Sequence, residues 1–145
     1  TLSCLAPSRE GTVKLSFFGG LSFGQVQPPE PTEDGVLEVA SLPDLFATKL
    51  NTIYQRAEPR DYLDIYAILE SGLSLSQGLS WCQEVYGPNY NRLLPMQALC
   101  YFNEPELRDL PETVRSVLIA AVQAEMRKEG LSPITVESSV RTRMK

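Results

Sequence analysis

The chain has 145 residues, of which 43 % are hydrophobic, with a net charge of −5 and an isoelectric point near 4.8. This acidic balance argues against a broad surface that coats nucleic acid, but leaves room for a local basic pocket. The sequence contains no histidine, which excludes imidazole-based catalysis and histidine-based zinc sites.

No apolar run approaches the ~20 residues of a membrane-spanning helix, so no membrane association is predicted. The three cysteines are Cys4, Cys82 and Cys100. They lie too far apart in the sequence for a zinc knuckle. Three is also an odd number for a disulfide framework, which indicates a reducing, cytoplasmic setting. Cys82 and Cys100 lie in apolar stretches and are expected in the core.

The first 40 residues have the pattern of strands. Residues 2–5 and 12–18 flank a turn at residues 8–11, which predicts a hairpin. Apolar and polar side chains alternate in the second strand, so one of its faces is expected to be buried. The apolar side chains of that face are Val13, Leu15 and Phe17.

A third strand is predicted at residues 23–27, and a short last strand at residues 36–40. A proline-rich loop at residues 28–31 lies between them, because its rigid backbone blocks a helix.

From residue 41 onward the pattern is helical. Ser41 is a plausible N-cap, with Asp44 three residues further along in the arrangement of a capping box. Apolar residues follow at helical spacing. Pro59 suits the first position of a second helix, which Gly72 ends. The apolar residues of the first helix are Leu42, Leu45, Phe46, Leu50 and Ile53.

Three further helices are predicted, at residues 75–86, 95–102 and 111–130. The sequence thus predicts an α/β (α+β) fold, in which a small, mostly antiparallel sheet from residues 1–40 packs on a bundle of about five helices within residues 41–130. Residues 131–145 are expected to form a frayed tail with a basic end.

The densest set of chemically active side chains lies between Lys49 and Asp64. At about 100° per residue, Lys49 and Arg56 fall within the apolar arc of their helix, with Thr52 at its edge. A cation on the core side must meet an anion, because burying it alone is very costly. The nearest anions are Asp61 and Asp64 on the next helix, where Asp64 also lies four residues after Arg60.

Two interpretations of this cluster stay open at this point. In the first, the cluster is an ion-pair network that locks a helical hairpin. In the second, it is a phosphate-handling site, where lysine and arginine face a nucleotide and an aspartate orients them or a metal.

Several segments resemble one known family, the AbiEii/AbiGii-type nucleotidyltransferase toxins. They are V-A-S-L-P-D-L-F-A-T-K-L at residues 39–50, Gln55-Arg56, R-D-Y-L-D-I at residues 60–65, Tyr86 and A-L-C-Y-F at residues 98–102. The resemblance implies a DNA polymerase β-type core with a helical C-terminal half, of which residues 1–40 would be the sheet remnant. It also implies a toxin of an abortive-infection, type IV-like toxin–antitoxin system, with an antitoxin partner. Some members modify tRNA, using a nucleoside triphosphate and Mg²⁺.

The resemblance also assigns roles to residues. Lys49, Asp61 and Asp64 match catalytic positions, with Lys49 on triphosphate oxygens and Asp61 orienting Lys49 or the attacking hydroxyl. The positions that match nucleotide or phosphate binding are Lys14, Thr52, Arg56 and Arg60.

One part of the family pattern has no counterpart, namely Gly-Ser followed by Asp-x-Asp, whose carboxylates hold the metal. The aspartates stand at positions 34, 44, 61, 64 and 109, and no two have that spacing. No metal ligand is therefore assigned, and this chain alone is expected to be inactive. Either an N-terminal segment is absent from the sequence, or the protein is a degenerate relative that binds a nucleotide or an antitoxin without catalysis.

Overall fold

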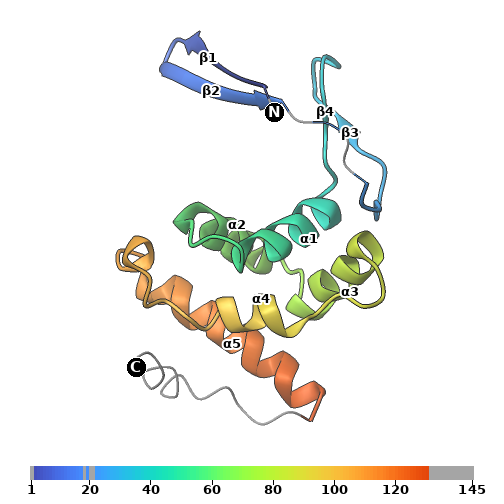
Figure 1. The fold of residues 1–145 in the computed structure, drawn as a ribbon, viewed down its shortest axis with the longest axis vertical. Helices are drawn as coiled ribbons and strands as arrows, with labels where there is room; N and C mark the ends of the chain where they lie inside the picture. The colour runs from blue at the N-terminus through green and yellow to red at the C-terminus, as the bar shows by residue number, and fades with distance from the viewer. Residues whose placement is uncertain (1, 18, 20–21, 131–145) are drawn as a thin grey trace, which may run out of the picture.

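The computed structural model describes residues 2–17, 19 and 22–130. Short antiparallel strand pairs come first and helices follow (Figure 1), which confirms the predicted α+β class. The strands are β1 (Leu2–Ser8), β2 (Gly11–Phe17), β3 (Glu30–Pro31) and β4 (Glu38–Val39). The helices are α1 (Leu42–Ile53), α2 (Pro59–Glu70), α3 (Leu75–Tyr86), α4 (Leu93–Ala98), the 3₁₀ turn η1 (Pro105–Leu107) and α5 (Glu112–Lys128).

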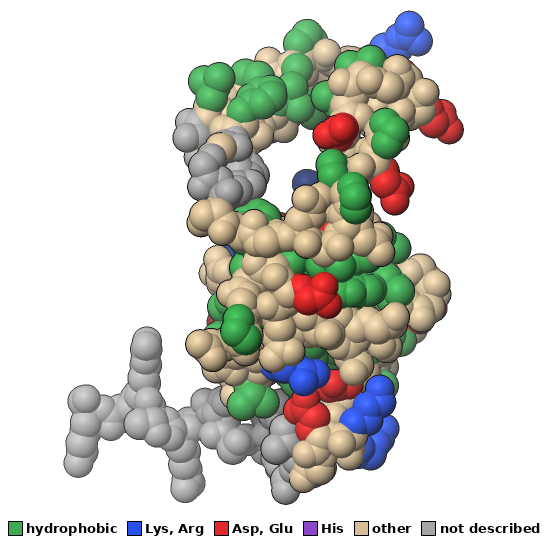
Figure 2. Space-filling model, turned by 90° about the vertical axis from the view of Figure 1, so that its right-hand side faces the viewer, with side chains coloured by type: hydrophobic (Ala, Val, Ile, Leu, Met, Phe, Trp, Pro, Cys, Tyr) green, Lys and Arg blue, Asp and Glu red, His purple; other side chains and the backbone are tan. Residues whose placement is uncertain are grey.

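The hairpin of β1 and β2 has an apolar face that stays open. Its antiparallel register sets Leu2 opposite Phe17, Cys4 opposite Leu15 and Ala6 opposite Val13, so these six side chains share one face. The prediction that the face is buried is wrong: the exposed fractions of the three β2 residues are 46 % for Val13, 40 % for Leu15 and 57 % for Phe17. Alternation identifies the face, but no helix of the described chain covers it. Figure 2 shows apolar side chains gathered at this end of the molecule.

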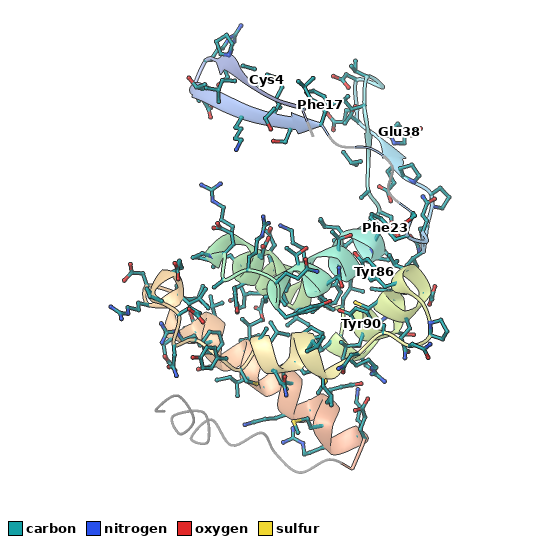
Figure 3. The ribbon with its side chains drawn as sticks, in the orientation of Figure 1. Cys4, Phe17, Phe23, Glu38, Tyr86 and Tyr90 are labelled. Carbon is teal, nitrogen blue, oxygen red and sulfur yellow. The ribbon has the colours of Figure 1, made fainter. Side chains whose placement is uncertain are left out.

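The segment at residues 23–27 is not the predicted strand but an irregular strap across the helices. The Gly24 N–H donates to the Val85 carbonyl at 2.7 Å, beside the end of α3. A Cβ on Gly24 would lie 2.8 Å from the Glu84 carbonyl oxygen, so this approach requires glycine. The Phe23 ring lies 5.7 Å from that of Tyr86, centroid to centroid (Figure 3). The strap is therefore anchored to α3.

Asp44 anchors the other end of the strap and also completes the start of α1. Its carboxylate accepts the N–H groups of Val26 at 2.8 Å and Gln27 at 3.0 Å. Ser41 caps α1 as predicted, because its hydroxyl oxygen accepts the Asp44 N–H at 3.2 Å. The Ser41 hydroxyl in turn donates to the Asp44 carboxylate at 2.5 Å. Burial alone would raise the pKa of Asp44, but these hydrogen bonds outweigh it and lower the pKa.

The last predicted strand shrinks to two residues, since only Glu38 and Val39 pair, with Pro31 and Glu30 respectively. α3 and α5 follow prediction, whereas α4 begins at Leu93 and ends at Ala98, so that it covers only part of the helix predicted at residues 95–102. α5 closes the core from the other side, and Cys82 and Cys100 are buried as expected. The tail at residues 131–145, like Phe18 at the predicted end of β2, lies outside the described residues.

A second ion-pair group joins the start of α4 to α5. Glu125 is 3 % exposed, and its carboxylate accepts from Arg92 at 2.7 Å. Arg92 also pairs with Glu129 at 2.8 Å. This group has no signal in the sequence, because its partners lie more than 30 residues apart along the chain. None of the helices in the described ranges has the length and apolar character needed to cross a membrane.

The core forms where α1 crosses α3. Phe46 and Leu50 of α1 are fully buried and press against Gly78 of α3. A Cβ built on Gly78 would lie 2.7 Å from a carbon of each of these two side chains. The Phe46 ring is also in edge contact with Trp81, which limits how far it can move. Gly78 therefore sets how closely the two helices approach.

We predict that Gly78→Ala lowers the free energy of unfolding by roughly 1–2 kcal/mol. Overpacking a core costs about 1–3 kcal/mol, which outweighs the gain of up to ~1 kcal/mol from replacing a helical glycine by alanine. Urea denaturation followed by far-UV circular dichroism measures the difference. Gly19→Ala is the control, since no atom lies within 4 Å of its added Cβ. Equal stability of the Gly78 variant and the wild type would contradict this view of the helix crossing.

Candidate functional site

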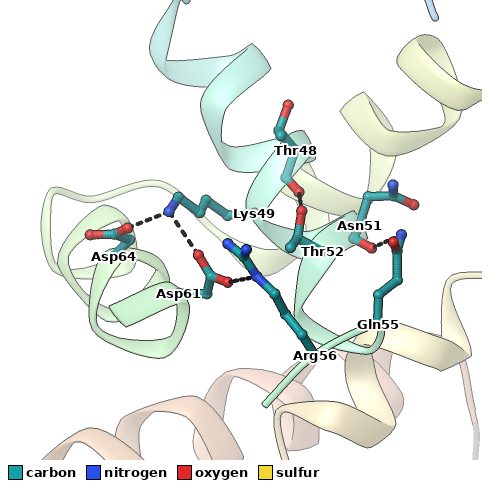
Figure 4. Close-up of polar contacts among 8 residues, drawn as sticks. All are labelled: Thr48, Lys49, Asn51, Thr52, Gln55, Arg56, Asp61 and Asp64. Carbon is teal, nitrogen blue, oxygen red and sulfur yellow. Dashed lines mark hydrogen bonds and ion pairs between the residues drawn. The ribbon is translucent and has the colours of Figure 1, made fainter. Parts of the chain in front are cut away.

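Four charged side chains form a line of alternating sign between α1 and α2 (Figure 4). The Lys49 Nζ lies 2.5 Å from the Asp64 Oδ2 and 2.8 Å from the Asp61 Oδ1. The other oxygen of Asp61, Oδ2, accepts from the Arg56 Nε at 3.0 Å. The order is thus Asp64, Lys49, Asp61, Arg56. The predicted approach of Lys49 to the two aspartates across the helix junction is confirmed.

Asp61 is the buried member of this line. Its side chain is 2 % exposed, and both of its oxygens are bonded to cations. It also lies in the first turn of α2, where the positive end of the helix dipole favours an anion. Burial alone would raise the pKa of Asp61, but the hydrogen bonds and charges of Lys49 and Arg56 outweigh burial and lower it. Asp61 is therefore a fixed, ionised anchor.

The two cations on Asp61 differ in exposure. The Lys49 side chain is 21 % exposed and that of Arg56 is 60 % exposed. Burial alone would lower the pKa of Lys49, but its bonds to Asp61 and Asp64 outweigh this effect and raise the pKa. The bond to Asp61 also raises the pKa of Arg56. Both cations stay charged at neutral pH.

A pocket of about 410 Å³ opens over this line of charges. Three cations and three carboxylates contribute to its lining, so the wall is formally neutral. The lining residues are Lys49, Arg56, Glu58, Arg60, Asp61, Leu63 and Asp64. The pocket reaches solvent, because Arg56 and Arg60 are both exposed.

The structure brings five of the seven predicted site residues to this pocket and leaves two outside its lining. Lys14 lies exposed on β2, in the hairpin. Thr52 is bonded within its own helix, its hydroxyl donating to the Thr48 carbonyl at 2.8 Å. Thr52 therefore directs its donor along α1 rather than toward a ligand.

One expectation about the arrangement is wrong. Arg56 does not share the apolar arc of α1, because that helix ends at Ile53 and Arg56 lies in the connection that follows. Asp64 pairs with Lys49, as predicted. Glu58 and Leu63 also line the pocket and were not predicted. The only signal for them was their position in the sequence, two residues before Arg60 and next to Asp64 respectively.

Asp61 and Asp64, as they are paired here, do not fit a resident Mg²⁺. Such an ion needs free carboxylate oxygens, whereas both oxygens of Asp61 and one oxygen of Asp64 already accept bonds from cations of the protein. Within residues 2–17, 19 and 22–130, no group of three or more acidic, cysteine or histidine side chains is arranged to hold a metal ion.

A comparison with known families gives a match over residues 2–137. The matching family is described as nucleotidyl transferase AbiEii toxin, Type IV TA system. The chain belongs to this AbiEii family. The resemblance seen in the sequence is thereby confirmed, and with it the general kind of protein, a nucleotidyl transferase toxin of a type IV toxin–antitoxin system. No curated protein and no solved structure matches the chain.

We predict that Lys49→Met in this AbiEii chain lowers the free energy of unfolding by about 1–3 kcal/mol. The substitution leaves the buried Asp61 carboxylate with Arg56 alone, and an undersatisfied buried acceptor costs roughly that amount. Lys14→Met, on the exposed face of β2, should stay within about 0.5 kcal/mol of the wild type. Urea titration measures both. If the two variants are equally stable, the ion-pair line does not contribute to the fold.

The pairing of Asp61 should make the free energy of unfolding depend on pH in the acid range. The pKa of Asp61 in the folded chain is below the ordinary aspartate value of 3.8, because Lys49 and Arg56 stabilise the carboxylate. Its stabilising contribution is therefore complete above the unfolded pKa and is lost as the pH falls through the lower folded pKa. Between about pH 5 and pH 2, the free energy of unfolding should fall more steeply for the wild type than for Asp61→Asn. Parallel curves from urea titrations across this range would contradict the assignment.

Proposed function

We propose that the pocket between α1 and α2 binds the phosphates of a nucleoside triphosphate and forms the nucleotide-holding part of an AbiEii-type nucleotidyltransferase. The observation that carries this proposal is the line of Lys49, Asp61 and Arg56 in an open pocket, with Arg60 on the same wall. Arginine and lysine donate charge-assisted hydrogen bonds to phosphate oxygens. Asp61 positions two of these cations.

The donors of the pocket are only partly used. Arg56 bonds Asp61 through Nε, which leaves the two terminal nitrogens of its guanidinium for a ligand. Arg60 adds a second guanidinium. In this proposal, Lys49 binds triphosphate oxygens and Asp61 holds it in place. The roles given to Lys14 and Thr52 stay predictions, because neither lines the pocket.

Transfer itself requires more than this pocket supplies. When bound, Mg²⁺ would offset the charge on the phosphates, as the family's chemistry implies. The sequence, however, has no Asp-x-Asp pair, and both oxygens of Asp61 are already bonded to cations. We therefore propose that this chain binds nucleoside triphosphate but does not transfer a nucleotide by itself. In the complete system, the acceptor would be an RNA such as tRNA, and the partner an antitoxin protein.

Calorimetry with a nucleoside triphosphate tests the binding. Weak, salt-sensitive binding is expected, because phosphate contacts made by exposed cations are screened. Arg60→Gln should weaken it by roughly fivefold or more, the loss of about 1 kcal/mol from one such contact. The matched control is Arg127→Gln, an exposed arginine of α5 outside the pocket. Equal binding by both variants would contradict the proposed site.

A transfer assay tests the proposal that this chain does not transfer a nucleotide by itself. Labelled nucleoside triphosphates, Mg²⁺ and bulk tRNA are incubated with this chain, and no labelled RNA is expected. Metal-dependent labelling that Lys49→Met abolishes would contradict the proposed inactivity, while supporting the pocket.

A further inference from the structure

The position of Asp64 has a consequence for how the pocket accepts an anion. We propose that Asp64 competes with the phosphate ligand for Lys49. In this proposal, Asp61 is the positioning residue that keeps Lys49 and Arg56 in place when the ion pair between Asp64 and Lys49 breaks. This inference rests on the proposed function and adds the order in which the contacts of that site exchange.

The two aspartates are held very differently. The Asp61 side chain is 2 % exposed and has two cationic partners, whereas that of Asp64 is 48 % exposed and pairs, within the described part of the chain, with Lys49 alone. An exposed ion pair is worth only about 0–1 kcal/mol, whereas a buried charge cannot leave its partner without a large cost. Of the two bonds of Lys49, the one to Asp64 is therefore the one that a ligand can displace.

The charge balance of the pocket supports the same conclusion. Its lining carries the cations Lys49, Arg56 and Arg60 and the same number of carboxylates, and the whole chain has a net charge of −5. Such a wall offers a polyanion little net attraction. When Asp64 turns toward solvent, the remaining line of Lys49, Asp61 and Arg56 carries one net positive charge.

The geometry allows this exchange without movement of the helices. Asp64 stands at the outer end of the line, and Figure 4 shows Lys49 between it and Asp61. Loss of the Asp64 contact leaves the Lys49 ammonium still held by Asp61 at 2.8 Å. A phosphate oxygen then takes the place of a carboxylate oxygen, one acceptor for another.

The test measures binding of inorganic tripolyphosphate by calorimetry at about 150 mM salt, where the Debye length is ~8 Å. We expect Asp64→Asn to bind it about fivefold more tightly than the wild type, because the competing anion is gone. Asp64→Glu should restore binding close to that of the wild type. Circular dichroism verifies that each variant is folded.

Glu58→Gln is the matched control. Glu58 lines the same pocket and its removal changes the net charge by the same amount, but the carboxylates bonded to Lys49 are those of Asp61 and Asp64. Its effect should remain below about twofold, as expected for a screened charge. Equal tightening by Glu58→Gln and Asp64→Asn would overturn the proposal, since net charge alone would then explain both.

Asp61→Asn separates the two aspartates. We expect it to weaken tripolyphosphate binding at least about fivefold, the opposite direction from Asp64→Asn. If the wild type binds and Arg60→Gln weakens binding, but Asp64→Asn binds no more tightly than the wild type, only this further inference fails. If neither the wild type nor Asp64→Asn binds, the proposed function fails with it.

A second readout follows Lys49 directly. Labelling with an amine-reactive acetylating reagent, read by mass spectrometry, should be faster at Lys49 in Asp64→Asn than in the wild type, since one of its two carboxylate partners is gone. Tripolyphosphate should slow it. Lys14, exposed on β2, serves as the internal reference. An unchanged ratio of Lys49 to Lys14 labelling between the two proteins would overturn the competition.

Discussion

The carboxylate of Asp61 is the buried anion around which the junction of α1 and α2 is arranged. It forms ion pairs with Lys49 of α1 and with Arg56 of the connection after that helix. Because a buried carboxylate must be paired, its position constrains where α1 ends, how the connection turns and where α2 begins. The ion-pair lock and the phosphate-handling site are thus compatible, since the same side chain can hold the fold and the cations.

This double role has an energetic limit. Buried ion pairs often contribute little net stability compared with apolar packing, because desolvation offsets their attraction. Helix α1 is instead held in the core by apolar packing against α3, through side chains such as Phe46 and Leu50. The charges between α1 and α2 then fix orientation. Because apolar packing holds α1 in place, Lys49 can lose its exposed partner Asp64 while the geometry of the site is kept.

The sequence was sufficient to predict the central part of the site. A cation on the apolar side of α1 needed an anion, and the nearest ones along the chain were those that the structure pairs with it. Local signals also predicted the helix starts at Ser41 and Pro59. The helix starts depend on neighbours within about one helical turn, where spacing determines contact. The partners of Lys49 lie on the next helix, and they were predictable because an unpaired cation on the core side is too costly.

Features that depend on distant partners could not be predicted in this way. The strap at residues 23–27 resembled a strand because nothing in its pattern shows that Asp44 and the Val85 carbonyl take its N–H groups. Alternation in β2 identified an apolar face but not what covers it. Arg56 was placed on the wrong surface because the end of α1 was set too late by a few residues, and each residue rotates a side chain by about 100°.

The glycine at the crossing of α1 and α3 connects core packing to the chemistry of the pocket. Phe46 and Leu50, which touch Gly78, flank Lys49 within a single turn of the same helix. A larger residue at position 78 would push that turn outward and displace the Cα of Lys49 with it, although position 78 does not line the pocket. Among variants selected for loss of ligand binding, some should therefore map to the far side of α1, where inspection of the pocket alone would not explain them.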